Sequence, residues 1–118
     1  MSISPISDNA TMTLHRALDA LNQRQQAIAS NVANLETPGY IAREVSFEAS
    51  LRSAARTGNP EDADVSVSRS LAPTRLNGNN VNIDMELLAG SETALQQQLV
   101  VQGLNAKYQM LRTAITGR

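Results

Sequence analysis

The feature that most constrains the fold is a stripe of apolar residues near the start of the chain. The stripe consists of Leu14, Leu18, Leu21, Ile28, Val32 and Leu35. Their 4-3-7-4-3 spacing is that of a narrow coiled-coil seam, which only Gln25 interrupts. Good N-cap residues at positions 7–9 precede the stripe, and Pro38 follows it, where a helix cannot continue. The pattern predicts an N-terminal helix over residues 8–35, behind a flexible segment at residues 1–7.

A second helical pattern lies at the other end of the chain. Asp84 is a suitable N-cap and Gly117 a suitable C-cap, so we predict a helix over residues 84–116. Its later part carries an apolar stripe that includes Leu104, Tyr108, Leu111 and Ile115. Its earlier leucines, Leu88, Leu95 and Leu99, lie on roughly the opposite side at about 100° per residue. A helix whose apolar side changes in this way is expected to touch different neighbours at its two ends.

The middle of the chain, residues 36–83, has weaker patterns and is expected to be an extended arm or loop region. Ile41, Val45 and Phe47 alternate as in a short strand or extended arm, although Phe47 and Leu51 are equally suited to begin a short helix. Val65 and Val67 allow a second short strand. The predicted fold is one mainly α domain over residues 1–118, in which the two terminal helices pair in a coiled-coil-like manner around an extended or short-β middle.

Composition excludes several classes of function. Net charge is -1 and basic residues do not cluster, so nucleic acid is not an expected partner. The chain has 0 cysteines, which excludes disulfides and thiolate metal sites. It has no apolar run of about 18 residues that would span a membrane. Its start lacks the basic and apolar regions of a cleavable secretory signal.

Candidate catalytic and metal-binding groups are each better explained structurally. His15 is the single histidine and has no nucleophile motif beside it. The carboxylates at 62, 64, 84 and 86 are of the residue type that cleaves glycosides in pairs, but aromatic residues to hold sugar rings are lacking. Residues 77–80 do not follow the order of a calcium loop. We therefore expect no enzyme activity, no cofactor, no metal and no small-molecule ligand.

Aromatic residues make up only 3% of the chain, and two of the three lie in the arm, Tyr40 and Phe47. Because a few buried aromatic side chains often dominate an interface, we expect these two to anchor the arm to a neighbouring subunit. The alternative is that the arm folds back over its own helices as a small core.

Two asparagines, Asn31 and Asn34, stand just before the end of the first helix, although asparagine is a poor helix former. Their side chains are able to bond the freed carbonyls of the last turn or a neighbouring chain.

The segment that contains these asparagines, Ala29-Ser-Asn-Val-Ala-Asn-Leu-Glu-Thr-Pro-Gly-Tyr40, closely resembles the N-terminal signature of flagellar rod, hook and hook-associated proteins. The familiar form is A-S-N-[IV]-A-N-x-x-T-P-G-Y. It is matched at Asn31, Asn34, Thr37, Pro38, Gly39 and Tyr40. Residues 40–51, 78–86 and 111–117 are similar to the corresponding segments of a proximal rod protein in this family, whose length also fits.

The resemblance implies a structural subunit of the proximal rod, part of the drive shaft that transmits torque and of the wall of the export channel. It also implies a periplasmic position, reached through the flagellar type III apparatus without a cleavable signal. The implied partners are further copies of the chain, other rod proteins, the rod adaptor, and components of the export gate and MS ring. The alternatives are the sister rod protein, which usually ends in a different motif, and a helical adaptor or chaperone of the export system.

Overall fold

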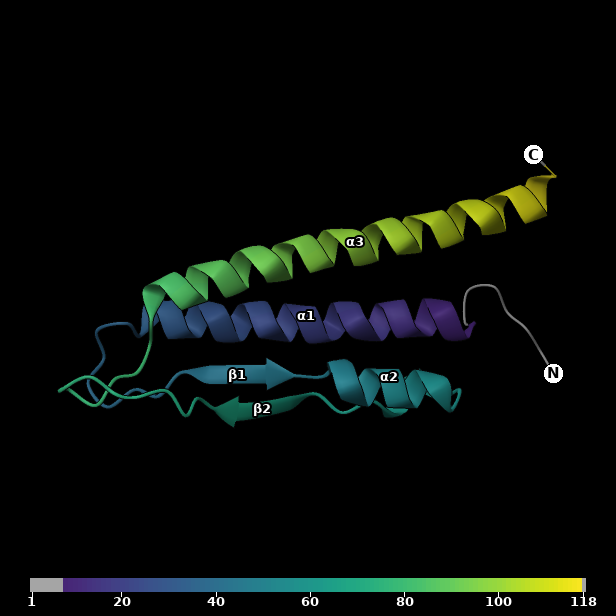
Figure 1. The fold of residues 1–118 in the computed structure, drawn as a ribbon. Helices are drawn as coiled ribbons and strands as arrows, with labels where there is room; N and C mark the ends of the chain where they lie inside the picture. Colours follow the sequence, from purple (N-terminus) through teal and green to yellow (C-terminus); the bar gives the residue numbers. More distant parts are fainter. Residues whose placement is uncertain (1–7, 118) are drawn as a thin grey trace.

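The computed structural model describes residues 8–117, and the predicted flexible segment at residues 1–7 lies outside them. The chain forms three layers (Figure 1). Helix α1, Asn9–Ala33, is the middle layer, and helix α3, Ile83–Thr116, covers one side of it. An arm covers the other side, and the molecule measures 64 × 27 × 14 Å. The predicted fold class is confirmed: the chain is mainly α, with long helices near both ends and a short β region between them.

The arm contains both kinds of element that its sequence allowed. Strand β1, Arg43–Ser46, is followed directly by helix α2, Glu48–Arg56. A single 3₁₀ turn, η1 at Pro60–Asp62, leads to strand β2, Ser66–Arg69. The two strands pair antiparallel, with Val45 opposite Val67.

The arm folds back onto α1 and forms the apolar core with it. Buried side chains from both layers meet there: Ala20, Leu21, Val45, Phe47, Leu51, Ala54 and Ala63. Phe47 is only 7% exposed. The arm thus forms a small core within the chain, which was the alternative to our expectation of an intermolecular anchor. The physical reason is that α1 offers a second apolar side, around Ala20, that the heptad seam did not reveal.

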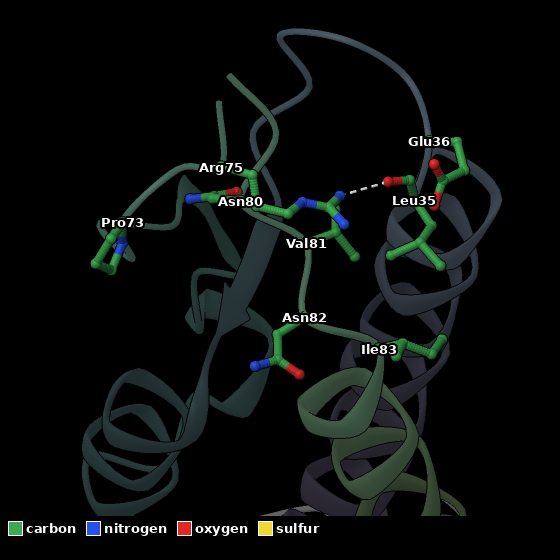
Figure 2. A pocket seen from close by; sticks show the side chains of 8 residues that line it. All are labelled: Leu35, Glu36, Pro73, Arg75, Asn80, Val81, Asn82 and Ile83. Atoms are coloured by element: carbon green, nitrogen blue, oxygen red, sulfur yellow. Dashed lines mark hydrogen bonds between the residues drawn. The ribbon is translucent and has the colours of Figure 1, made fainter. Parts of the chain in front are cut away.

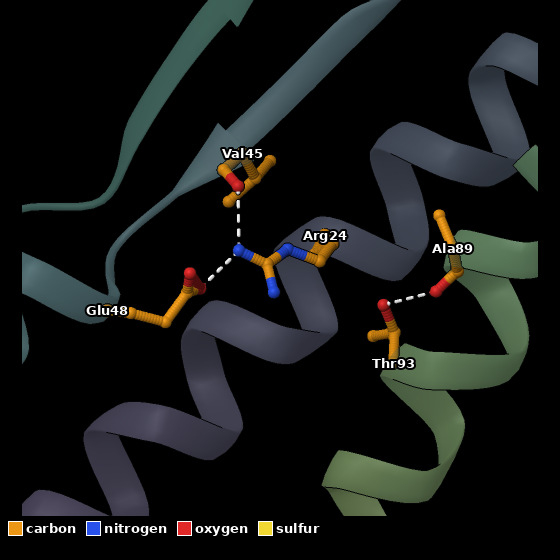
Figure 3. A network of polar contacts seen from close by, with 5 residues as sticks. All are labelled: Arg24, Val45, Glu48, Ala89 and Thr93. Carbon is orange, nitrogen blue, oxygen red and sulfur yellow. Dashed lines mark hydrogen bonds and ion pairs between the residues drawn. The ribbon is translucent and has the colours of Figure 1, made fainter. Parts of the chain in front are cut away.

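Arg24 fastens the arm to α1 (Figure 3). Its guanidinium donates a 2.8 Å hydrogen bond to the Val45 carbonyl and forms an ion pair with Glu48. The guanidinium carbon also lies 4.8 Å from the centroid of the Phe47 ring, a favourable cation–π distance. One side chain of α1 therefore contacts the strand, the helix and the aromatic residue of the arm.

Helices α1 and α3 run antiparallel in close contact. A Cβ at Gly90 would lie 3.7 Å from Ile28, and one at Gly103 would lie 3.3 Å from Leu14. Small residues at these positions let the helices approach. Near the far end, Lys107 Nζ lies 2.9 Å from the Asp8 carboxylate, and this hydrogen bond is the main reason why the pKa of Asp8 falls to about 2.

Within the chain, α3 packs on α1 along one side, although its apolar residues change side along the helix as its sequence indicated. Thr93 is 1% exposed and Leu104 is 6% exposed, and both lie on the side turned to α1. The earlier leucines, by contrast, are more than half exposed. Small residues such as Gly90 occupy the contact side there, and a hydrophobic pattern does not detect them. The N-cap of α3 is Asn82 rather than Asp84, because the Asn82 side chain accepts from two backbone amides of the first turn.

Candidate functional site

The signature segment and the segment that leads into α3 meet at one end of the helix pair. Four asparagines from these segments form a hydrogen-bonded group, which we call the asparagine cluster: Asn31, Asn34, Asn79 and Asn80. Three of the four are buried, with exposed fractions of 1% for Asn31, 0% for Asn79 and 6% for Asn80. Buried amides must be hydrogen-bonded to be tolerated, so their partners define what the cluster does.

Asn31 links α1, β1 and α3. Its amide nitrogen donates to the Arg43 carbonyl at 2.9 Å and to Glu86 Oε1 at 3.0 Å. Its amide oxygen accepts from the Arg43 backbone N–H at 3.0 Å and from the Tyr40 hydroxyl at 3.1 Å. An asparagine amide offers two donors and two acceptor positions, and all four are used. Aspartate has no donors to offer here, so the site requires the amide.

The two hydrogen bonds between the Asn31 side chain and the Arg43 backbone have the pattern of strand pairing. In an antiparallel sheet, the N–H and C=O of one residue point to the same edge. β2 occupies one edge of β1, and Asn31 bonds both backbone groups of Arg43 on the other. The Val45 carbonyl on that edge accepts from Arg24. Side chains of α1 thus take the place of a third strand.

Glu86 is the ionisable group of the site with a shifted pKa. Partial burial raises the pKa of its carboxyl above the ordinary value. The hydrogen bond from Asn31 favours the charged form and opposes part of this effect, while the negative charge of Glu44 adds to it.

Asn34 ends α1 and shapes the turn behind it. Its side-chain nitrogen donates to the Ser30 carbonyl at 2.8 Å, so it bonds a carbonyl of the last helical turn. Its side-chain oxygen accepts from the Thr37 hydroxyl at 3.1 Å. Of the two roles that the sequence left open for this residue, the structure contains the bond to the last turn.

Gly39 brings the turn against the segment before α3. Its φ of 75° lies in the left-handed region, and its N–H donates to the Asn77 carbonyl at 2.8 Å. A Cβ at Gly78 would lie 3.2 Å from the Gly39 Cα, closer than a side chain normally approaches a backbone atom. Pro38 and Thr37 are exposed at this turn, and Tyr40 is half-buried against α1.

Asn79, in the segment before α3, bonds back to the signature segment at the end of α1. Its nitrogen donates to the carbonyls of Asn34 and Thr37, both at 2.8 Å, and its oxygen accepts from the Val81 N–H at 2.7 Å. It therefore connects the end of α1 to the chain that enters α3.

Asn80 binds the arm. Its oxygen accepts from the Ala42 N–H at 2.7 Å, and its nitrogen donates to the carbonyls of Ser70 at 3.3 Å and Ala72 at 3.1 Å. The sequence did not identify Asn79 and Asn80 as site residues. Two signals were available: the density of asparagines between positions 77 and 82, and the similarity of residues 78–86 to the corresponding segment of a proximal rod protein.

Beside the cluster lies an open groove of about 470 Å³ (Figure 2). Leu35, Val81 and Ile83 line it on one side and Pro73 on the other, with Arg75 reaching across to donate to the Leu35 carbonyl at 2.6 Å. Within residues 8–117 no group of three or more histidine or acidic side chains is placed to hold a metal. The side chains of the site hydrogen-bond backbone groups of neighbouring segments and hold these segments together. This arrangement favours a structural role.

The predicted interface residues fall into two groups. Leu21 and Leu104 are buried, and most of the others are partly buried along the helices: Leu14, Leu18, Ile28, Val32, Leu35 and Leu111. Leu14 and Ile28 lie against the glycines of α3. Tyr108 and Ile115 remain 40% and 75% exposed, although the Tyr108 hydroxyl lies 3.0 Å from His15 Nε2. None of the helices that the structure describes is long and apolar enough to cross a membrane.

Comparison with known proteins identifies similar chains. Residues 13–40 match the family model described as flagella basal body rod protein. The chain is 32% identical to the flagellar basal body rod protein FlgB of Bacillus subtilis, over 88% of this chain and 91% of that protein. It is 27% identical to FlgB of Escherichia coli, over 85% and 88% of the two chains. It is 30% identical to FlgB of Borreliella burgdorferi, over 73% and 80%.

Proposed function

This chain belongs to the FlgB family of flagellar basal body rod proteins, and from that premise we propose that it builds the proximal part of the rod. It is a structural subunit of the bacterial flagellar rod. The observation that carries this conclusion is similarity to FlgB proteins over nearly the whole chain, including both helices and the arm. The same observation favours FlgB over the sister rod protein and over an export adaptor. In the proximal rod, the chain would transmit torque and form part of the export channel wall.

The geometry supports a role that depends on rigid surfaces. The asparagine cluster fixes the end of the helix pair, and Arg24 fixes the arm to α1, so the three layers are held as one unit. The family is structural and is not a known enzyme family. We propose that the chain acts entirely through contacts between subunits and needs no cofactor, metal or small-molecule ligand.

The chain belongs in the flagellar basal body and assembles with other rod components. More specifically, we propose contacts with further copies of the chain, the rod adaptor, and components of the export gate and MS ring. We also propose that the type III apparatus exports the chain to the periplasm. Exposed apolar side chains near the C-terminal end of α3, such as Tyr108 and Ile115, are available for these contacts. Nucleic acid is not among the proposed partners.

Removal of the gene tests the proposal. Cells without the chain are expected to stop swimming, and basal bodies isolated from them should end before the rod in electron micrographs. A plasmid copy should restore both. Complete rods in cells that lack the chain would refute the proposal.

A pair of point variants tests the assembly surface separately from folding. Ile115→Asp puts a charge on an exposed apolar position and is expected to prevent rod assembly without changing the helix content of the purified chain. Gln109→Asp, an exposed polar position on the same helix, is the matched control and should assemble. If the two variants assemble equally well, Ile115 is not part of a subunit contact.

A further inference from the structure

Asn77 is the only asparagine of the chain that precedes a glycine, Gly78. In such a pair the backbone nitrogen of the glycine can attack the carbon of the asparagine side-chain amide, which is the first step of spontaneous deamidation. Glycine favours this step because it has no Cβ to hinder the approach and rotates freely. The Asn77 side chain is also exposed, so water reaches it. This pair is therefore a candidate site of covalent modification.

The Asn77 side chain is oriented by the chain that follows it. Its amide oxygen accepts a hydrogen bond from the Asn79 N–H at 3.1 Å. Attack on the Asn77 Cγ places negative charge on this oxygen, and a backbone N–H directed at the oxygen stabilises that charge. The fold thus holds the carbon that is attacked in a position where the attack is favoured.

The Gly78 nitrogen, in contrast, is restrained by a turn. Its N–H donates to the Arg75 carbonyl at 2.9 Å, and the Arg75 N–H donates to the Asn79 carbonyl at 2.8 Å. The Arg75 guanidinium ties this turn to the end of α1 by donating to the Leu35 carbonyl at 2.6 Å (Figure 2). The Gly78 nitrogen attacks only after it gives up its proton, so its bond to Arg75 must open first. The folded turn therefore slows the reaction.

We propose that Asn77 is a site of spontaneous deamidation and that the folded turn restrains its rate. The Gly78 nitrogen forms a bond to the Asn77 Cγ, and the side-chain nitrogen leaves as ammonia, taking the proton of the Gly78 amide. The product is a cyclic succinimide. Water then adds to either carbonyl carbon of the ring and breaks the bond from that carbon to the Gly78 nitrogen, which gives aspartate or isoaspartate. Water is the only co-reactant, and nothing is oxidised or reduced.

The two products differ in their effect on the contact with the signature turn. Aspartate leaves the main chain unchanged and still offers an acceptor to the Asn79 N–H. Isoaspartate carries the main chain through Cβ and Cγ, which lengthens it, and the former carbonyl becomes a free carboxylate. In the folded chain that carbonyl accepts from the Gly39 N–H at 2.8 Å, and a Cβ at Gly78 would lie only 3.2 Å from the Gly39 Cα. A longer main chain does not fit this close approach, so isoaspartate opens the contact.

Incubation of the purified full chain at pH 8, in native buffer and in guanidinium chloride, tests the proposal. Tandem mass spectrometry of proteolytic peptides locates each amide that becomes an acid. In the unfolded chain, Asn77 should convert faster than every other asparagine. In native buffer it should convert at least about tenfold more slowly, which corresponds to an opening free energy of about 1.4 kcal/mol. Asn59 is the internal control, because it is also exposed but precedes Pro60, whose nitrogen has no proton to lose.

Two variants separate the chemistry from the restraint. Asn77→Gln should show no conversion at this position, since the longer side chain would have to close a larger ring. Arg75→Ala loses the bond to Leu35, so it should convert faster than the wild type in native buffer and at the same rate in guanidinium chloride. The proposal is overturned if Asn77 converts no faster than Asn59 in the unfolded chain. It is also overturned if folding does not slow the conversion, or if Arg75→Ala and the wild type convert equally fast in native buffer.

The isoaspartyl chain itself tests the structural consequence. Methylation by an isoaspartyl methyltransferase measures its fraction in aged protein, and chromatography separates it. This chain should unfold at a lower urea concentration than Asn77→Asp, which carries the same additional charge on an unaltered main chain. Equal unfolding midpoints would overturn the expected loss of the contact with Gly39. All these outcomes leave the proposed function intact, since that is judged by rods in cells lacking the gene.

Discussion

Replacement of Asn79 by alanine tests whether the asparagine cluster fixes the end of the helix pair. The side chain is 0% exposed and makes three hydrogen bonds to backbone groups. Alanine removes all of them and leaves a space too enclosed for the backbone to find other partners easily. The change therefore removes a connection between α1 and α3 without touching the apolar seam.

The expected loss can be worked out from the three bonds. The Val81 N–H has no other partner within the described residues, and an unsatisfied buried donor costs about 1–3 kcal/mol. The carbonyls of Asn34 and Thr37 each keep a second, backbone donor, so each lost bond there removes about 0.5–1.5 kcal/mol. Together these give a decrease of about 2–6 kcal/mol in the free energy of unfolding, a large part of the 5–15 kcal/mol of a typical domain.

Urea unfolding of the purified chain, followed by circular dichroism at the helix band, measures this loss. Asn77→Ala is the matched control, because Asn77 is exposed in the same segment and its side chain accepts one bond, at 3.1 Å from the Asn79 N–H. It should change stability by less than about 1 kcal/mol. A decrease of under about 0.5 kcal/mol for Asn79→Ala, or an equal decrease for both variants, would refute the reasoning.

Four further substitutions probe the contact between the helices and the partly buried carboxylate of Glu86. Leu21→Asp places a charge at a position that is 2% exposed, so we expect loss of several kcal/mol and no incorporation into rods; cells that swim normally would contradict this. Gly90→Ala should raise the free energy of unfolding by about 0.5–1 kcal/mol, because the new Cβ fits at 3.7 Å, whereas Gly103→Ala, at 3.3 Å from its neighbour, should gain less in the same melt. Glu86→Gln keeps an acceptor for its partner amide and removes a charge that folding disfavours. Since folding raises this pKa, the variant should be the more stable chain at pH 7. That advantage should shrink as pH falls through the raised pKa of Glu86 and be gone below the ordinary value of 4.5; a constant difference from pH 3 to 8 would exclude Glu86 as the cause.

The two long helices could be predicted because their signals are local. The stripe that includes Leu14 and Leu21 repeats within one helix, and Pro38 marks its end without any knowledge of the rest of the chain. The position of the arm could not be predicted in the same way. Phe47 packs on α1 because that helix has a second apolar side, and the choice between its own helix and a neighbour's depends on three-dimensional fit.

The asparagine cluster shows most clearly which contacts cannot be predicted from the sequence. Asn79 bonds Asn34 across 45 positions of sequence and Thr37 across 42. An asparagine in a turn and one that closes a long loop look alike in the sequence. Asn31 and Asn34 stood out only because they occur where a helix former was expected, and no such contrast marks asparagines in an irregular segment.

Coverage of the β1 edge by α1 side chains has a consequence for the free subunit. An open strand edge is a template on which other chains add, and this is a common route to aggregation. The side chains that cover this edge, Asn31 and Arg24, belong to α1 and not to the arm. The edge is therefore covered only after α1 has formed and docked against the arm. A chain with an unfolded α1 exposes this edge, and one without the Asn31 amide leaves the backbone of Arg43 unprotected. The solubility of the unassembled protein therefore depends on the same side chain that holds its layers together.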